Sequence, residues 1–446
     1  MPEQVKSQAV KRARRASDPL NNRIDPLDRA AHDWFRFVLS FPPHLVRQYT
    51  ERFGLGKKHR VLDPFCGTGT TLVECKKHGI ASVGVEANPM AHFASRVKVD
   101  WSPNADGLVE HATHIAQDAL RILRRQGIDD VRTAFSDAAS KSDLIALRCL
   151  PDEAQTLLLT DSISPLPLHK VLVLLEQIDR NRDDRYYDHE RLAVAKAAVF
   201  SFSNLHFGPE VGVGPAKQDV PVVAPWLDAV KSVGENLCVL GARQATPAGV
   251  RLADARAIAE VVKPRSIDAV ITSPPYPNEK DYTRTTRLES VLLGFVRSKA
   301  ELRALKAGMV RSNTRGVYKG DDDDRWITAH PEIQRIAVQI EIRRLELGKT
   351  SGFERLYARV TKLYFGGMAR HLADLRTVLR PGAHLAYVVG DQASYLRVMI
   401  RTGQLLADIA RSLGYTVESI DLFRTRLATA TREQLREEVV VLRWPG

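Results

Sequence analysis

The chain has 446 residues, of which 44% are hydrophobic, and this is enough material for two or three domains with a sizeable core. No apolar run reaches the roughly 18 to 20 residues of a membrane span, and no apolar segment follows the basic amino terminus as it would in a secretory signal. We therefore expect a soluble, cytoplasmic protein. The formal net charge of +12 favours a polyanionic partner.

The cysteines are scattered without a CxxC pair, which argues against both a zinc site and a disulfide framework. They are Cys66, Cys75, Cys149 and Cys238, and we expect them to be reduced. An acidic run at 321–324 is expected to be a surface loop, because no His or second carboxylate cluster with ligand spacing lies nearby. No metal site is predicted.

A strand, a glycine turn and a helix are predicted over residues 60–74. Gly67 and Gly69 let the backbone pass close to a ligand, because glycine has no Cβ. Thr70 and Thr71 are expected to cap the helix, whose free amide groups then face polar or anionic ligand atoms. The turn lacks the lysine that follows the last glycine of a phosphate-cradling P-loop.

Glu86 ends the next predicted strand, which begins at residue 81. An acidic residue about 20 residues after a glycine turn is placed to accept hydrogen bonds from ribose hydroxyls. A merely solvated strand end is the alternative. Asn88 and Pro89 then begin a predicted helix, and another helix is expected from about His44, before the glycine turn.

A second motif, Ser273-Pro274-Pro275-Tyr276, closes the apolar run 267–272. Two consecutive prolines cannot donate to a sheet ladder, so the backbone leaves the strand as a stiff, extended loop. Such a loop can present Ser273 Oγ and the Pro274 carbonyl as two acceptors, with the Tyr276 ring as a flat wall beside them. This is a pocket for an aromatic amine, and an ordinary strand-ending turn is the alternative.

Residues 101–248 interrupt the alternation of strands and helices with helical patterns at 107–126, 168–180 and 224–242. This mostly helical insertion holds 15 Lys and Arg against 20 Asp and Glu. It is therefore not expected to be the main phosphate-contacting face. Its Gly- and Pro-rich stretch at 207–215 indicates a loop or hairpin.

The alternation resumes with a strand at 250–252, which Asp254 ends. A long helical stretch is predicted through residue 379, and it is expected to stop at Arg380-Pro381-Gly382. A strand at 383–389, a helix at 403–412 and an antiparallel edge pair at 416–423 and 438–442 complete the pattern. The alternation predicts an α/β fold.

Two segments are candidates for contact with nucleic acid. Residues 280–319 hold ten Lys and Arg against three Asp and Glu, with Tyr282 and Tyr318 interleaved. The candidate DNA contacts are Arg284, Arg287, Arg311 and Arg315. A solvated helix and loop is the alternative. Residues 1–20 are predicted to be a disordered basic tail, which either adds nonspecific phosphate contacts or has no role.

The ordered pair of motifs resembles that of S-adenosylmethionine-dependent DNA amino-methyltransferases. Its segments are Asp63-Pro64-Phe65-Cys66-Gly67-Thr68-Gly69-Thr70-Thr71 and Thr272-Ser273-Pro274-Pro275-Tyr276. The resemblance extends to Phe41-Pro42-Pro43, Glu86, Asp254 and the Leu379-Arg380-Pro381-Gly382 strand lead-in, about half the chain. It implies a Rossmann-like methyltransferase sheet with helices on both faces, formed by residues 21–100 and 249–446 around the insertion 101–248.

The resemblance also implies roles for these residues. In the family, the glycine loop holds the methionine part of the cofactor, the position of Glu86 binds the ribose, and that of Asp254 binds the adenine amino group. The cofactor site implied for S-adenosylmethionine comprises Asp63, Phe65, Gly67, Gly69, Thr70, Thr71, Glu86, Asn88 and Asp254. The catalytic residues implied are Ser273, Pro274, Pro275 and Tyr276, which hold a flipped-out target base.

A Ser at the first position of the tetrapeptide favours cytosine N4 as the target, whereas Asp is more usual for adenine N6. The implied partner is double-stranded DNA, with a cognate restriction endonuclease or defence-system subunits as further candidates. The alternatives are an adenine N6 enzyme, an RNA base amino-methyltransferase and a non-catalytic nucleic-acid-binding subunit of a restriction or defence complex. The insertion precedes Asp254 and the basic segment follows Ser273, so which of them reads DNA sequence stays open.

Overall fold

The computed structural model describes residue 25 and residues 28–35, 40–130, 146–207, 211–278, 280–427 and 434–446. The basic tail predicted at 1–20 lies outside the described residues. Seven strands form the main sheet and two form a small hairpin. They are β1 (Arg60–Asp63), β2 (Ala81–Glu86), β3 (Leu205–Phe207), β4 (Val211–Val213), β5 (Ala248–Leu252), β6 (Ile267–Thr272), β7 (Leu379–Gly390), β8 (Thr416–Leu427) and β9 (Gln434–Arg443).

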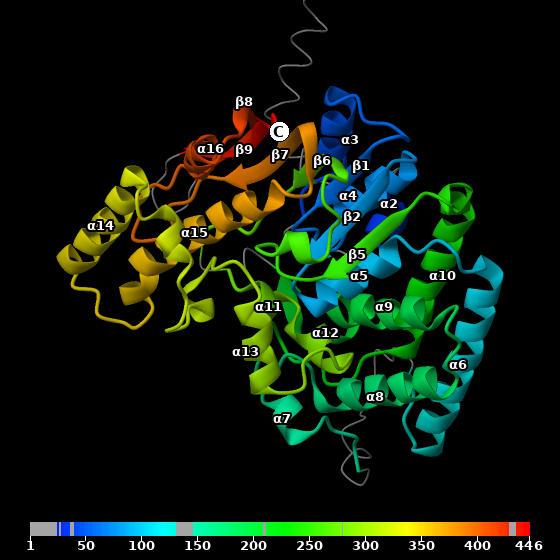
Figure 1. Cartoon of the computed structure of the whole chain (residues 1–446). Helices are drawn as coiled ribbons and strands as arrows, with labels where there is room; N and C mark the ends of the chain where they lie inside the picture. The colour runs from blue at the N-terminus through cyan, green and yellow to red at the C-terminus, as the bar shows by residue number, and fades with distance from the viewer. Residues whose placement is uncertain are drawn as a thin grey trace, which may run out of the picture.

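In the described part of the chain, two helices precede β1, and the others lie between the strands along the chain (Figure 1). They are α2 (Arg29–His32), α3 (Pro43–Arg52), α4 (Thr70–Lys77), α5 (Pro89–Lys98), α6 (Ala105–Arg125), α7 (Asp152–Gln155), α8 (Pro165–Arg180), α9 (Tyr187–Ala197), α10 (Val223–Leu240), α11 (Tyr282–Thr285), α12 (Arg287–Leu292), α13 (Lys299–Ala307), α14 (Pro331–Glu346), α15 (Tyr357–Leu375) and α16 (Thr402–Ser412).

The main sheet has the strand order β5-β2-β1-β6-β7-β9-β8. Neighbours from β5 to β7 pair in parallel, and β9 pairs antiparallel with both β7 and β8. Such a sheet must be covered on both faces. The predicted α/β class and Rossmann-like sheet are confirmed, as is the antiparallel edge pair.

Alternate residues of the central strands pack into two different cores, because successive side chains of a strand point to opposite faces. Leu385 and Tyr387 of β7 pack in the core that holds α14, α15 and α16. Ala386 and Val388, between and beside them, pack in the core that includes Tyr49 of α3. Helices therefore cover both faces of the sheet.

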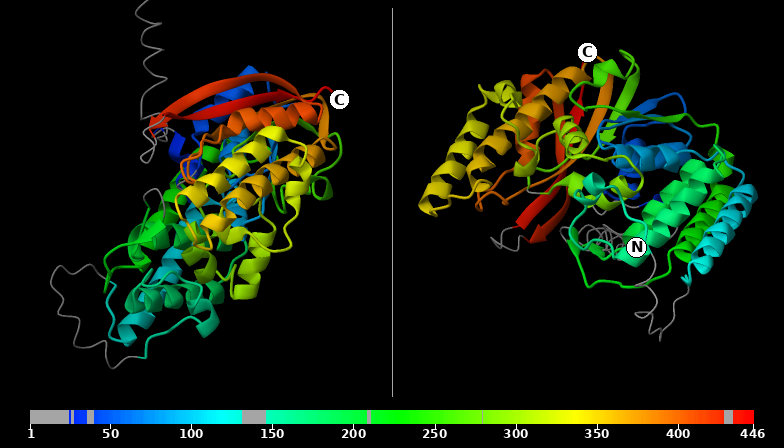
Figure 2. Two further views of the ribbon diagram at one scale, coloured as in Figure 1. Left: turned by 90° about the vertical axis from the view of Figure 1, so that its left-hand side faces the viewer. Right: turned by 90° about the horizontal axis from the view of Figure 1, so that it is seen from below.

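The insertion helices α6, α8, α9 and α10 gather on the β5 side of the sheet, at the opposite end of the molecule from α14 (Figures 1 and 2). They share one core with Phe93 of α5 and Trp34. Trp34 Nε1 donates a hydrogen bond of 3.0 Å to Asn236 Oδ1 of α10. The boundaries of the insertion as a unit remain a prediction, since its core is continuous with that of α5.

The helix predicted to run through residue 379 is wrong at its end. The described chain has two helices here, and α15 stops at Leu375. Leu379 already pairs with Ile267 of β6, and the next aligned pair is His384 with Ala269, so the Pro-Gly step lies in a bulge within β7. Proline is tolerated at a bulge because its missing N–H breaks no regular ladder bond there.

The acidic run at 321–324 is not a simple surface loop. Asp323 is buried and forms ion pairs with Arg256 and Arg370, while Asp321 pairs with Arg311. Arg256 and Arg370 are distant from Asp323 in sequence, so local composition did not indicate these pairs. Among the described residues, no helix is long and apolar enough to cross a membrane, and no cluster of three or more His, Cys, Asp or Glu side chains is arranged to hold a metal.

Candidate active site

The glycine turn and the Ser-Pro-Pro-Tyr loop leave the same edge of the sheet from adjacent strands. β1 and β6 pair in parallel, with Val61 opposite Ala269 and Leu62 opposite Val270. From β1 the chain continues to β2 on one side of β1, whereas β6 and β7 follow one another on the other side. The order of strands therefore reverses between β1 and β6. Open α/β sheets bind their ligands at such a switch point, outside the carboxyl ends of the strands.

Two side-chain hydrogen bonds join the two motifs. Thr272 Oγ1 donates to Asp63 Oδ1 over 2.6 Å, and Thr71 Oγ1 donates to the Ile271 carbonyl over 3.1 Å. Asp63 is fully buried, and this burial raises its pKa to about 6, although the bond from Thr272 acts in the opposite direction. Asp63 and Thr71 therefore hold the motif loops together, and neither lines the cavity described below.

Both glycines of the turn adopt left-handed backbone conformations, with φ of +50° at Gly67 and +86° at Gly69. A Cβ at Gly69 would lie 2.6 Å from Ser95 Oγ, whereas a Cβ at Gly67 would meet no atom within 4 Å. The prediction that the threonines cap α4 is wrong. Gly69 is the N-cap residue and no side chain caps the helix, so Thr70 is its first residue and its amides stay free for a ligand.

Glu86 lies at the end of β2 beside the glycine turn. Its Oε2 accepts from Gly67 N, and its Oε1 accepts from Asn88 N, both over 2.8 Å. An ionised carboxylate has about four lone-pair sites, so further acceptor capacity is left for ligand hydroxyls. Burial raises the pKa of Glu86 to about 7. The two amide hydrogen bonds lower this pKa, whereas the nearby charge of Asp63 raises it further.

Asn88 is occupied by the fold. Its side-chain oxygen accepts from Met90 N and Ala91 N and so caps α5, and its Nδ2 donates to Thr286 Oγ1 over 3.0 Å. The residue lies on the wall of the cavity, but the side chain has its partners. If Asn88 contributes to the cofactor site as predicted, it does so by holding Glu86 through its backbone N–H, because its side-chain amide already has partners.

The Ser273 hydroxyl is hydrogen-bonded to the neighbouring strand. Its Oγ lies 3.1 Å from the carbonyl oxygen of Val388 on the neighbouring β7. A carbonyl only accepts, so the serine hydroxyl donates and keeps its lone pairs for another donor. Ser273 and Val388 both line the cavity. The arrangement prepares Ser273 Oγ as a hydrogen-bond acceptor.

Tyr276 packs its ring against the end of β7. A Cβ at Gly390 would lie 2.9 Å from Tyr276 Cε2, so the glycine makes room for the ring. The Tyr276 backbone N–H lies 3.4 Å from Tyr282 Oη of α11. Burial raises the pKa of Tyr276, with a further contribution from the negative charge of Glu437. The ring is therefore held in place as a neutral phenol.

One cavity of about 670 Å³ connects these elements. It is lined by all four residues of the tetrapeptide and by five of the predicted cofactor residues, namely Phe65, Gly67, Thr70, Glu86 and Asn88. The glycine turn faces it without a Cβ, and the free α4 amides and the Glu86 carboxylate adjoin it. These groups fit the polar amino-acid and ribose parts of S-adenosylmethionine.

Asp254 does not line this cavity, although its neighbour Ala255 does. Its carboxylate accepts from the Arg256 backbone N–H over 2.8 Å and from the Arg256 guanidinium, with the closest contact at 2.6 Å. The Asp254 carboxylate, for which an adenine contact was predicted, is thus already paired with Arg256 in this structure. The sequence pattern could not show this, because a strand-ending Asp looks the same whether paired or free.

Two of the four candidate DNA contacts are occupied inside the fold. Arg311 is only 4% exposed and pairs with Asp321. Arg287 donates to the carbonyls of Thr283 and Leu157. Arg284 is partly buried, and Arg315 is exposed. Counting charges along the sequence overstated the basic surface, because it could not identify buried ion pairs. The exposed basic residues of the segment are Arg297, Lys299, Arg303, Arg315 and Lys319.

The structure adds wall residues that the motifs did not indicate. Met309 and Val310 come from the stretch after α13, and Phe423, Arg424 and Glu437 come from the β8–β9 pair. Arg424 Nε donates to Glu437 Oε2 over 2.5 Å. The sequence predicted the strand pair that carries Phe423, Arg424 and Glu437. It could not show that these residues reach the site, because this depends on the order of the strands in the sheet.

Known proteins resemble this chain along most of its length. The DNA methylase family model matches residues 31–95. The type II methyltransferase M.BsoBI of Geobacillus stearothermophilus is 25% identical over 436 residues, covering 93% of this chain and 84% of the relative. M.AvaI of a Nostoc species is 25% identical over 439 residues, covering 92% and 86%. M.MjaII of Methanocaldococcus jannaschii is 40% identical over 60 residues, covering 13% and 11%. The resemblance inferred from the two motifs is confirmed.

Proposed function

We propose that the chain is a DNA amino-methyltransferase and that it transfers the methyl group of S-adenosylmethionine to the exocyclic amino group of a flipped-out cytosine, at N4. The observation that carries this proposal is the single cavity lined by both the glycine turn and the Ser-Pro-Pro-Tyr loop. The relatives are named type II methyltransferases, and we extend to this chain the expectation of double-stranded DNA as substrate and of a cognate endonuclease.

The chemistry requires acceptors for the two amino hydrogens. An exocyclic amino group is a poor nucleophile because its lone pair is delocalised into the ring. Ser273 Oγ, whose own proton goes to Val388, and the Pro274 carbonyl each accept one N–H and so favour a tetrahedral nitrogen with a localised lone pair. The cofactor supplies an electrophilic sulfonium methyl. Glu86, Gly67 and the first turn of α4 hold and orient it.

The target base must leave the duplex, because its amino group is inaccessible to an enzyme inside the stack. Tyr276, fixed against Gly390, provides a surface on which the flipped base stacks, for about 1 to 3 kcal/mol. Cytosine is favoured over adenine because Ser stands first in the tetrapeptide, as in the N4 members of the family.

The class of polymer is tested by incubating the purified full-length protein with radiolabelled S-adenosylmethionine and either unmethylated plasmid DNA or total RNA. We expect label in DNA and none in RNA. Label in RNA alone would identify an RNA base methyltransferase. Label in neither polymer, with tight DNA binding, would identify a non-catalytic subunit.

The raised pKa of Glu86 predicts a pH-dependent affinity for the cofactor. The carboxyl holds its proton below about pH 7, and only the ionised form accepts from both ribose hydroxyls without itself donating. Since apparent affinity scales with the competent fraction, calorimetry should show binding that tightens about tenfold from pH 6 to pH 8. Glu86→Gln should weaken binding and abolish this pH dependence. An equal pH profile in both proteins would remove Glu86 from the cofactor site.

The exposed basic residues predict a salt-dependent affinity for DNA. Removing one side chain that binds a phosphate lowers the slope of log affinity against log salt by about 0.9. A triple Arg303, Arg315, Lys319→Ala variant should therefore lower that slope by up to about 2.7. The matched control is Arg325, Arg335, Arg343→Ala, which removes the same charge from other exposed positions. Equal slopes for the two triple variants would place the phosphate-binding residues elsewhere.

A further inference from the structure

One wall of the cavity is made by a short backbone stretch that follows α13. Gly308, Met309 and Val310 line it, as does Ala255 beyond the end of β5. β5 pairs with β2, and Leu252 lies opposite Glu86, so the chain that leads to Ala255 departs beside Glu86. This wall therefore belongs to the cofactor side of the cavity. The stretch begins at the C-terminal end of α13, where Gly308 is the C-cap residue, and its further course depends on what the backbone of 306–309 contacts.

The Arg311 guanidinium uses all five of its N–H groups on this stretch and on one carboxylate. It donates to the carbonyl oxygens of Lys306 at 2.7 Å, Met309 at 2.5 Å and Ala307 at 3.3 Å. The remaining two N–H groups form a forked pair with Asp321, at 2.9 and 2.8 Å. A buried arginine with this many partners has a defined orientation, and it fixes the carbonyls around it.

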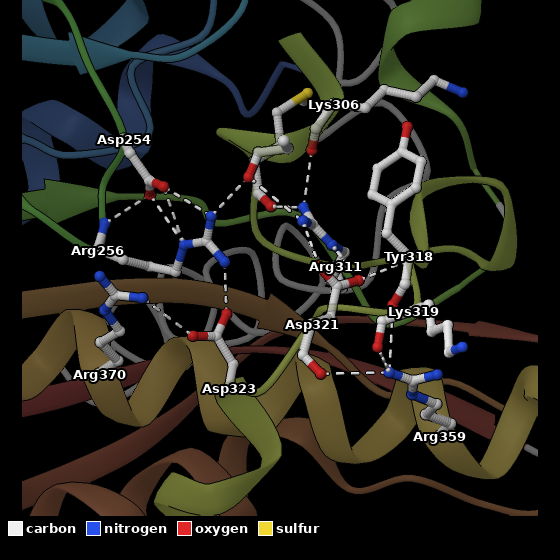
Figure 3. Close-up of polar contacts among 12 residues, drawn as sticks. Asp254, Arg256, Lys306, Arg311, Tyr318, Lys319, Asp321, Asp323, Arg359 and Arg370 are labelled. Carbon is white, nitrogen blue, oxygen red and sulfur yellow. Dashed lines mark hydrogen bonds and ion pairs between the residues drawn. The ribbon is translucent and has the colours of Figure 1, made fainter. Parts of the chain in front are cut away.

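Arg256 reaches the same backbone from the opposite side. Its guanidinium donates to the Ala307 carbonyl over 2.9 Å, to Asp254 over 2.6 Å, and to Asp323. It is 7% exposed. Because Arg256 is the residue after Ala255, this side chain connects the β5 end of the cavity wall to the Met309 end (Figure 3).

Asp323 anchors the cluster on α15, where the helix presents two adjacent glycines. A Cβ at Gly366 would lie 2.0 Å from the Asp323 carbonyl oxygen, so only glycine permits this approach. A Cβ at Gly367 would lie 3.3 Å from Val310, 3.4 Å from Asp323 Oδ2 and 3.7 Å from Arg256 Cδ. Val310 of the cavity wall, Asp323 and Arg256 therefore all pack against Gly367 of α15.

The charges of this cluster are matched and mostly buried. Arg256 and Arg311 face Asp254, Asp321 and Asp323, and Arg370 approaches Asp323 within 3.3 Å at the margin. Buried ion pairs contribute little net stability, since desolvation offsets their attraction. Breaking one leaves an uncompensated charge, so such clusters define a geometry. The two arginines are therefore not available to DNA phosphates.

We propose that Arg256 and Arg311 are positioning residues that hold the backbone of 306–309 so that Met309 and Val310 form the cofactor-side wall of the cavity. The proposal rests on the proposed function, because it takes the cavity to be the site of S-adenosylmethionine. It assigns to Arg311 a role in cofactor affinity in place of the DNA contact predicted from sequence.

The test uses Arg311→Lys and Arg256→Lys, which keep the charge but lose the planar fork of donors. We expect the cofactor Kd from calorimetry and the KM for cofactor to rise about tenfold, with kcat at saturating cofactor nearly unchanged. The slope of DNA affinity against salt should stay at the wild-type value. The matched control is Arg325→Lys, at an exposed arginine of the 3-10 helix that contains Asp323, and it should change none of these quantities.

A purely structural role gives a different result. It lowers the fraction of folded enzyme, and hence the apparent kcat, without moving KM. Cofactor Kd values of Arg311→Lys and Arg256→Lys within twofold of wild type would overturn the proposal. A lowered salt slope in Arg311→Lys would instead return this residue to the DNA interface and would also overturn it.

A second variant perturbs the wall without touching a charged side chain. Gly366→Ala places a methyl group against the Asp323 carbonyl and should weaken cofactor binding as the lysine variants do.

If these variants do not fold, amide hydrogen exchange on the wild-type protein provides the test. Added cofactor should slow exchange in 306–310, and no change there would overturn the proposal. Failure of the wild type to bind cofactor at all would instead refute the proposed function.

Discussion

Replacing Ser273 by Ala is expected to slow methyl transfer by about two to three powers of ten in single turnover. The hydroxyl donates to the Val388 carbonyl and offers its lone pairs to the cavity, so the variant removes one of two acceptors for the amino hydrogens. That acceptor is needed most where the amino nitrogen becomes tetrahedral. Cofactor affinity should be unchanged, and DNA affinity should fall much less than the rate.

Ser266→Ala is the matched control for this experiment. Ser266 immediately precedes β6, at the end away from the cavity, and its hydroxyl likewise donates to a carbonyl, that of Lys263, over 2.6 Å. Its loss should leave the transfer rate within about twofold of wild type. A Ser273→Ala protein that transfers methyl at the wild-type rate would refute the acceptor mechanism, even if the product is the expected one.

Replacing Gly69 by Val is expected to abolish measurable cofactor binding. The backbone at this position has φ of +86°, which a β-branched residue adopts only with strain, and the new Cβ would lie 2.6 Å from Ser95 Oγ and 3.3 Å from Ser95 Cα. The turn must shift, and with it the first amides of α4 and the Gly67 N–H that Glu86 accepts.

The control is Gly249→Val, at a glycine in β5 whose Cβ would meet no atom within 4 Å. Valine suits a strand, so this protein should fold and bind the cofactor normally. Calorimetry on both folded variants gives the answer. Unchanged cofactor affinity in Gly69→Val would show that the glycine turn is not the cofactor site.

Sequence patterns predicted the sheet elements and the two motif loops because both depend on local signals. The glycine turn, the strand-ending Glu86 and the paired prolines each determine their own backbone. Parallel pairing of β1 with β6 then brings the carboxyl ends of both strands to one edge of the sheet, and this places the Ser273 loop beside the turn.

The errors concern side-chain pairings that local composition does not show. Arg311 looked like part of a DNA-binding surface, yet the fold brings Asp321 and three carbonyls to its guanidinium. Asp254 was predicted to have a free carboxylate, but it pairs with Arg256 two residues later, because the fold turns these two side chains toward each other. Arg424 and Glu437 reach the cavity because β9 inserts between β7 and β8, an order that no local pattern encodes.

The most direct test of the central claim is the identity of the modified nucleoside. Unmethylated plasmid DNA is incubated with the full-length protein and S-adenosylmethionine carrying a labelled methyl group, then digested to nucleosides and separated by chromatography with mass detection. We expect label in N4-methylcytosine. Label in N6-methyladenine would contradict the cytosine assignment and leave the acceptor mechanism in place. Label in 5-methylcytosine would contradict the account as a whole.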